Sequence, residues 1–155
     1  MANIAQSVNV ISPLMTTKDG LMKQTIWWPW LLFCKYMRGW TIASHVSSPA
    51  YEGATEPAWM RAAVDTPWLD VSAVVSDDGW VSMVVVNVHQ TNGFEVELDG
   101  VASSGKVQVH TITGSKWDVV NTDAEQAVGI KESEWDGKGK FDFQRMSATM
   151  LRWKP

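Results

Sequence analysis

The sequence predicts a mainly β chain, in which an antiparallel, jelly-roll-like β-sandwich follows a single β/α unit. Three observations predict this arrangement. Apolar and polar residues alternate in many short segments after residue 39, and turn-forming pairs such as Asp-Gly and Asn-Gly separate those segments. Before residue 39, a short apolar run is followed by a helical pattern. We therefore divide the chain into residues 1–39 and residues 40–155.

Residues 1–39 are predicted to form a strand, a loop and a helix. Residues 8–14 make a nearly continuous apolar run rich in β-branched side chains, which is typical of a strand covered on both faces in a parallel sheet. Apolar residues from 27 to 37 predict a largely buried helix, with Pro29 tolerated in the first turn and Gly39 ending it. One such unit cannot bury itself, so it is interpreted as the end of a larger assembly.

Seven short strands are predicted after residue 39. They cover residues 41–46, 69–75, 80–88, 94–98, 107–113, 141–145 and 149–153. Residues 94–98 alternate between apolar and acidic side chains, which predicts one buried and one solvated face, whereas residues 83–86 are apolar on both parities and should be central. Residues 49–67 are interpreted as a long connection and residues 121–140 as an irregular charged segment.

Composition excludes several classes of protein. The 155 residues are 45% hydrophobic and 19% charged, which rules out a disordered tail. A net charge of −4 argues against nucleic acid and anionic membranes as partners. The single cysteine, Cys34, excludes an intrachain disulfide and is expected to be a buried, inert thiol. The longest apolar run, residues 26–34, is far shorter than the roughly 20 residues of a membrane span.

Motifs for metal or nucleophilic chemistry are missing from the sequence. It has no Gly-x-Ser-x-Gly, His-Glu-x-x-His or phosphate-binding loop. The three histidines, His45, His89 and His110, lie on different predicted segments and lack metal-ligand spacing. We therefore expect no metal and no cofactor.

Glu95 and Glu97 are two carboxylates on a common face of a predicted strand, about 6.8 Å apart along it. This separation is close to that of glycosidase pairs. Nothing around them predicts a pocket that would raise a pKa, so they are interpreted as a solvated face.

Tryptophan is the outlier of the composition, with 10 residues. Exposed indoles commonly stack on sugar rings, whereas buried ones fill cores or domain interfaces. Seven of them lie after residue 39 and motivate a carbohydrate-binding interpretation: Trp40, Trp59, Trp68, Trp80, Trp117, Trp135 and Trp153.

Several blocks of the sequence resemble the α-L-arabinofuranosidases of glycoside hydrolase family 51. Residues 3–14, 23–29 and 36–39 are similar to the last β/α unit of that family's catalytic (β/α)₈ barrel, and residues 66–73, 85–87 and 150–153 to its C-terminal β-sandwich. The resemblance implies a retaining glycosidase that removes terminal arabinofuranosyl groups from arabinan, arabinoxylan and related polysaccharides or oligosaccharides. The family's two catalytic Glu residues lie on earlier barrel strands, so this chain is expected to contain no catalytic residue and to be inactive alone.

The resemblance implies three substrate-binding residues. Gln24 matches the glutamine in the loop after the family's eighth barrel strand, where an amide can donate to and accept from sugar hydroxyls. The alternative for Gln24 is a loop amide that ties down backbone groups. Trp27 and Trp28 are candidates for the pocket wall, and packing of the helix against the barrel is the alternative for both.

Three interpretations stay open. The leading one is the C-terminal piece of such an arabinofuranosidase, either a truncated gene model or a fragment, whose partner is the missing catalytic barrel. The second is a carbohydrate-binding sandwich without catalysis, and the third a structural domain that supports a barrel supplied in trans. Linkage preference, oligomeric state and compartment, extracellular or cytoplasmic, stay open.

Exposed apolar surface predicts self-association of the chain. The strand over residues 8–14 and the apolar helix face lack their cover, so the chain is expected to aggregate, and a chain starting near Trp40 to behave better. The family's N-terminus contributes a strand to the sandwich, so the improvement is expected to be partial.

Overall fold

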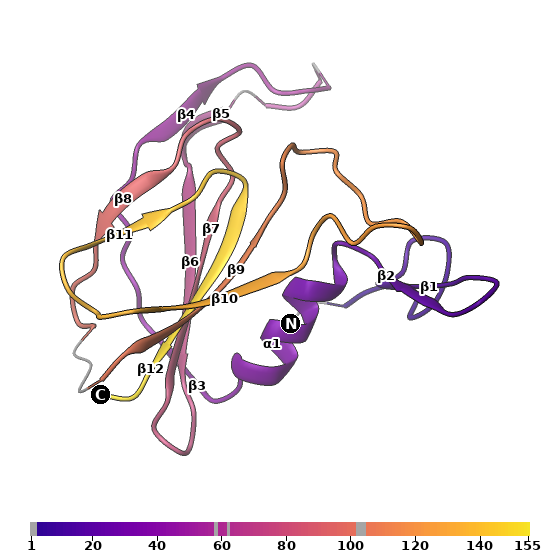
Figure 1. Cartoon of the computed structure of the whole chain (residues 1–155). Coiled ribbons are helices and arrows are strands. Elements are labelled where there is room, and N and C mark those ends of the chain that lie inside the picture. The colour runs from indigo at the N-terminus through magenta and orange to yellow at the C-terminus, as the bar shows by residue number, and fades with distance from the viewer. Residues whose placement is uncertain (1–2, 58, 62, 102–104) are drawn as a thin grey trace.

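The computed structural model describes residues 3–57, 59–61, 63–101 and 105–155. A six-stranded antiparallel sheet forms its centre, in the order β10-β9-β12-β7-β6-β3 (Figure 1). Its strands are β3 (Trp40–Ile42), β6 (Leu69–Val75), β7 (Val81–Asn87), β9 (Val107–Thr113), β10 (Ile130–Trp135) and β12 (Ser147–Trp153). The predicted mainly β, antiparallel fold is confirmed, and β6 and β9 occupy the predicted residues.

One face of the sheet is covered by a second, two-stranded layer. β8 (Phe94–Glu97) and β11 (Lys140–Phe143) pair antiparallel and carry their apolar side chains toward the sheet. The buried residues of the core between them are Leu69, Val85, Val107, Val109, Phe143, Leu151 and Trp153. Glu95 and Glu97, whose side chains point to the opposite face of β8, are exposed, so the predicted solvated face is confirmed.

The opposite face of the sheet is covered by the helix α1 (Trp27–Tyr36), which was predicted over residues 27–37. Its buried residues pack with the alternate residues of the strands in a second core, made of Trp28, Leu32, Val84, Ile112, Val128 and Met150. Neighbouring residues therefore serve different cores, as Val84 and Val85 of β7 do. This explains why residues 83–86 are apolar on both faces of the strand. β7 is central in the sheet, as predicted.

Gly39 joins α1 to the sheet at a position that accepts only glycine. Its φ is +135°, and a Cβ placed there would lie 2.1 Å from the backbone oxygen of Val75. β3 begins at the next residue, Trp40, which pairs with Val75. The lack of a side chain therefore lets the chain leave the helix and enter the sheet directly.

The strand predicted over residues 8–14 is wrong. Val8 makes an isolated parallel bridge to Leu14, and the backbone turns at Asn9 and Val10, whose φ values are 64° and 59°. A parallel strand needs neighbours on both sides, and the described residues supply no such neighbours for this segment. β1 (Leu14–Thr16) and β2 (Leu21–Lys23) form a short antiparallel hairpin instead, so the predicted barrel β/α unit is not present.

Three further strands lie in segments predicted to be irregular. β4 (Ala50–Gly53) and β5 (Ala63–Pro67) pair within the segment interpreted as a long connection. β10 pairs with β9 although most of its side chains are exposed. Backbone pairing rather than burial places β10 in the sheet, so it has no alternating apolar pattern for sequence analysis to detect.

The outer face of α1 is exposed. Leu31 and Phe33 are 36% and 40% exposed, and Cys34 is exposed as well, so the expected buried thiol is wrong. The helix is one layer with solvent on its far side, which leaves only the face carrying Trp28 and Leu32 buried. α1 and the sheet share a core, and the division into domains at residues 39 and 40 stays a prediction.

His110 lies beneath the C-terminal end of α1. It is 6% exposed, and its ring stacks on Tyr36 with the centroids 5.3 Å apart. Nδ1 lies 3.4 Å from a carboxylate oxygen of Glu132, and neither ring nitrogen has a hydrogen-bond partner among the described residues. Burial lowers the pKa of His110; Glu132 opposes this shift, while Arg152 and Lys35 add to it.

We expect His110 to make the folded chain less stable in mild acid. The unfolded chain binds a proton at this histidine below about pH 6.5, whereas the folded chain binds it only at lower pH. Stability should therefore fall as the pH drops below about 6.5 and level off below the folded pKa. Thermal unfolding between about pH 5 and pH 7.5 measures this, and His110→Phe should flatten the profile. An equally steep profile in His110→Phe would assign the dependence to other groups.

Candidate functional site

Gln24 lies at the junction of β2 and α1, where its main chain and side chain are both anchored. Its backbone N–H donates to Pro13 O at 2.8 Å, and its Nε2 donates to Ser12 O at 2.7 Å. Ser12 is fully buried. The backbone O of Gln24 accepts from Trp27 N at 3.0 Å, in the turn that starts the helix. The side-chain amide is therefore tied to the backbone of residue 12, the kind of contact that the alternative interpretation describes, and the main-chain N–H is tied to residue 13.

The turn that presents Ser12 is organised by Asn9. Asn9 adopts a left-handed φ, which asparagine tolerates better than most residues. Its Oδ1 accepts from Thr16 N at 2.8 Å and from Thr16 Oγ1 at 3.0 Å, while its N–H donates to Leu14 O at 2.7 Å. These bonds close residues 9–16 into a compact turn below Gln24.

The anchoring of Gln24 leaves part of its amide available. Nε2 uses one hydrogen for Ser12 O, and Oε1 has no hydrogen-bond partner in the part of the chain that the structure describes. An amide with a fixed plane and a vacant acceptor can receive a hydroxyl hydrogen from a ligand. The structure thus allows an anchoring role and a ligand-binding role for Gln24 together.

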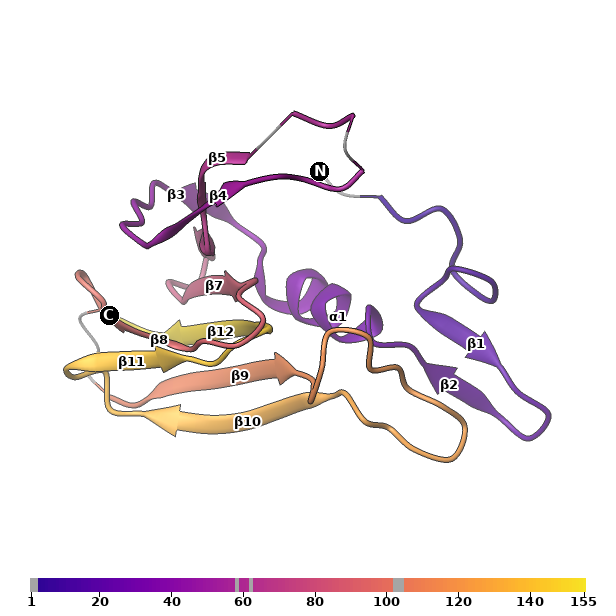
Figure 2. The ribbon, with the colours of Figure 1, turned by 90° about the horizontal axis from the view of Figure 1, so that it is seen from above.

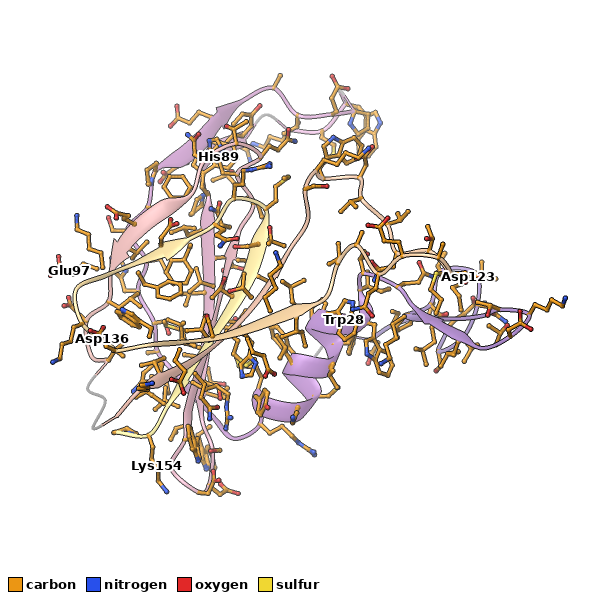
Figure 3. The ribbon with its side chains drawn as sticks, viewed as in Figure 1. Trp28, His89, Glu97, Asp123, Asp136 and Lys154 are labelled. Atoms are coloured by element: carbon orange, nitrogen blue, oxygen red, sulfur yellow. The ribbon has the colours of Figure 1, made fainter. Side chains whose placement is uncertain are left out.

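A polar hollow of about 560 Å³ adjoins this junction. It is lined by residues 17–23 of the β1–β2 hairpin and by residues 121–126 of the segment between β9 and β10. Figure 2 shows this segment extending from the sheet to the hairpin, and Asp123, labelled in Figure 3, lies at its far end. Two parts of the chain about a hundred residues apart in sequence therefore meet beside Gln24.

Trp27 and Trp28 pack against the sheet. Trp28, labelled in Figure 3, is 9% exposed and belongs to the core under α1. Trp27 is partly buried against the same core. Both indole nitrogens are buried without a hydrogen-bond partner among the described residues. Both therefore pack on the sandwich, and their predicted contact with sugar or with a barrel stays a prediction.

The seven tryptophans after residue 39 differ in their exposure. Trp153 is buried, and Trp68, Trp80 and Trp135 are half-buried. The exposed ones are Trp40, Trp59 and Trp117, which are 76%, 83% and 77% exposed and lie on β3, in the segment between β4 and β5, and in the segment after β9. Of the seven, these three offer the most exposed indole surface for stacking on a sugar ring.

Other candidate chemistry is dispersed. His89 accepts backbone hydrogen bonds from Thr91 and Asn92, which places it in a turn, and His110 lies under α1. Within residues 3–57, 59–61, 63–101 and 105–155, no group of three or more His, Cys, Asp or Glu could hold a metal ion. In the same residues, no helix has the length and apolar character needed to cross a membrane.

Sequence reasoning missed Asn121, which was assigned to an irregular segment. It is 6% exposed and bonds to Lys23 and Val128 through its side chain. A buried asparagine leaves no periodic signal, since its partners are backbone groups. Only the fold shows that it reaches the residue before Gln24.

Comparisons with known proteins point to one family. The family model described as "Alpha-L-arabinofuranosidase C-terminal domain" matches residues 1–147. A probable α-L-arabinofuranosidase C from Aspergillus terreus is 59% identical over 154 residues, which are 99% of this chain and 30% of that protein. The α-L-arabinofuranosidase C of Emericella nidulans is 56% identical over the same shares. The chain thus spans 30% of the length of these relatives.

Solved structures show the same architecture. The α-L-arabinofuranosidase of Thermotoga maritima, solved as an arabinose complex, matches with a TM-score of 0.82 and 25% identity over 97% of this chain and 33% of that chain. The thermostable GH51 α-L-arabinofuranosidase of Thermotoga petrophila matches with a TM-score of 0.81 and 25% identity over the same shares.

Proposed function

Because the chain belongs to the α-L-arabinofuranosidase C-terminal domain family, we propose that it works as the C-terminal part of a retaining α-L-arabinofuranosidase. The substrates of that enzyme are terminal arabinofuranosyl groups of arabinan, arabinoxylan and their oligosaccharides. In a retaining mechanism, one Glu attacks the anomeric carbon and a second Glu acts as acid and then as base. A catalytic barrel outside these 155 residues supplies both groups.

The role of this chain in that enzyme is to hold the Gln24 loop and to cover the barrel. The observation that carries the proposal is the anchored amide of Gln24, whose Oε1 is vacant while Nε2 is fixed on Ser12 O. Such an amide binds a furanose hydroxyl without losing side-chain freedom on binding. The exposed apolar side chains of Val10, Ile11 and Phe33 suit contact with a barrel.

A chimera tests this proposal. The chain replaces the matching 154 residues of the Aspergillus terreus relative, and hydrolysis of an aryl α-L-arabinofuranoside is measured. We expect the chimera to turn the substrate over and the isolated chain to be inactive. Gln24→Ala should raise KM about tenfold or more, as expected for the loss of a hydrogen bond to a sugar hydroxyl.

Gln90→Ala is the matched control, because Gln90 is an exposed amide on the sandwich. It should leave KM unchanged. Turnover by the purified 155-residue chain that disappears when one of its own Glu residues is replaced would overturn the proposal. An unchanged KM in Gln24→Ala would remove Gln24 from it.

Carbohydrate binding without catalysis is a second candidate, which the exposed Trp40, Trp59 and Trp117 favour. Binding to arabinoxylan should then retard the isolated chain on a polysaccharide gel and change its tryptophan fluorescence. Triple replacement of these residues by Ala should abolish both effects. A chain that migrates freely and shows no fluorescence change is not a binding module.

A further inference from the structure

The segment between β9 and β10 carries a hydrogen bond that reaches the Gln24 loop. Asn121 Nδ2 donates to the backbone O of Lys23 at 2.9 Å. Among the side-chain hydrogen bonds of the described residues, it is the one that joins residues 3–39 to residues 40–155. The sandwich is thereby tied to the residue that precedes Gln24.

Asn121 is itself held firmly. The same Nδ2 donates to Val128 O at 2.9 Å, and Oδ1 accepts from Val128 N at 2.7 Å. Val128 is 5% exposed and belongs to the core under α1, together with Trp28. The donor to Lys23 is therefore fixed by a buried part of the sandwich and not by a mobile surface side chain.

The acceptor belongs to a peptide group that is held from both of its sides. Lys23 O and Gln24 N are atoms of one planar peptide unit. Asn121 bonds to the oxygen, and Pro13 O accepts from the nitrogen at 2.8 Å. The following peptide unit is held as well, because Gln24 O accepts from Trp27 N at 3.0 Å. With the peptide units on both sides of its Cα held, the direction in which the Gln24 side chain leaves the backbone is fixed.

We propose that Asn121 is a positioning residue, which holds the peptide group between Lys23 and Gln24 so that the Gln24 amide is presented in one orientation. Its importance for substrate rests on the proposed function of Gln24. The sandwich then takes part in substrate binding without contacting the sugar. Asn121→Asp is the sharpest variant, since it keeps the acceptor for Val128 N and replaces the donor by an oxygen that repels both Lys23 O and Val128 O.

Hydrogen exchange tests the positioning in the 155-residue chain and in the chimera. The backbone N–H of Gln24 should exchange at least about tenfold faster in Asn121→Asp than in the unchanged chain. This is the fold-change expected for the loss of one hydrogen bond. Thr122→Ala is the matched control, because it removes the Oγ1 that accepts from Glu125 N and leaves Asn121 intact. Val128→Ala is a second control for any loss of overall stability, since it removes buried methyl groups from the same segment.

Kinetics of the chimera test the consequence for substrate. Asn121→Asp should raise KM about tenfold with kcat changed less than about threefold, and Gln24→Ala should not add to that increase when the two are combined. Thr122→Ala should keep the KM of the parent chimera. If the backbone N–H of Gln24 exchanges at the same rate in Asn121→Asp as in Val128→Ala, the positioning role of Asn121 is overturned.

The outcomes separate this inference from the proposed function. A chimera in which Gln24→Ala raises KM and Asn121→Asp does not would overturn the inference alone. A chimera without turnover would overturn the proposed function, and a chimera whose KM is unchanged by Gln24→Ala would remove Gln24 from it. In both cases the exchange rate of the Gln24 backbone N–H would still decide whether Asn121 holds the loop.

Discussion

Deletion of residues 1–39 is expected to destabilise the sandwich and to make it aggregate. The sequence alone predicts the reverse, because the N-terminal segment resembles part of a barrel whose remaining strands and helices are missing. In the structure, α1 is the cover of one face of the sheet, and its deletion would expose Val84, Ile112 and Met150, which are at most 8% exposed.

The expected loss is large. Burial of each large apolar side chain contributes about 1.5–3 kcal/mol. Deletion removes the burial of Trp28 and Leu32 and uncovers the sheet residues beneath them, so the free energy of unfolding should fall on the order of 5 kcal/mol. A domain of this size is stable by roughly 5–15 kcal/mol. A chain of residues 40–155 should therefore be partly unfolded and expose a continuous apolar sheet face.

Chemical denaturation and light scattering of residues 40–155, beside the full chain at matched concentration, measure the effect. The control is the double variant Leu31→Lys and Phe33→Glu, which changes the exposed face of α1 and leaves its buried face intact. It should reduce self-association of the full chain with little change in stability. A monomeric chain of residues 40–155 with an unchanged denaturation midpoint would show that α1 does not support the sheet.

The fold could be predicted where burial leaves a period in the sequence. β6 and β9 pack on the sheet core and occupy their predicted residues, whereas β10 is an edge strand with exposed side chains and was missed. The prediction of a strand over residues 8–14 failed for the opposite reason. This segment is rich in strand-forming side chains, but Val10 and Ile11 are 73% and 62% exposed, because the chain supplies no neighbouring strands to bury them.

The candidate site shows the same limit. Gln24 was found through resemblance, and the hydrogen bond to Ser12 O shows how the loop holds it. Asn121 could not be found, because its partners Lys23 and Val128 are backbone groups brought together by the fold. Polar residues that bond to a distant backbone impose no pattern on neighbouring positions, so their roles become visible only in three dimensions.

Asn87 is expected to be the most sensitive polar residue of the sandwich. It is 1% exposed at the end of β7, and its Nδ2 donates to the backbone oxygens of Asn92, Phe143 and Gln144 at 3.0–3.1 Å. Its Oδ1 accepts from His89 N at 2.9 Å. One amide therefore joins the turn after β7 to the connection between β11 and β12, which holds the small layer on the sheet.

Asn87→Ala should lower the free energy of unfolding by about 3 kcal/mol or more, because each buried backbone group left without a partner costs about 1–3 kcal/mol. Asn92→Ala is the matched control, since Asn92 is exposed in the same turn and its backbone oxygen stays in place; a change within about 0.5 kcal/mol is expected. Urea denaturation of the three proteins measures both effects. If Asn87→Ala unfolds at the same urea concentration as Asn92→Ala, water replaces the amide at this junction, and the contact between the two layers depends on the apolar core around Phe143 and Leu151 instead.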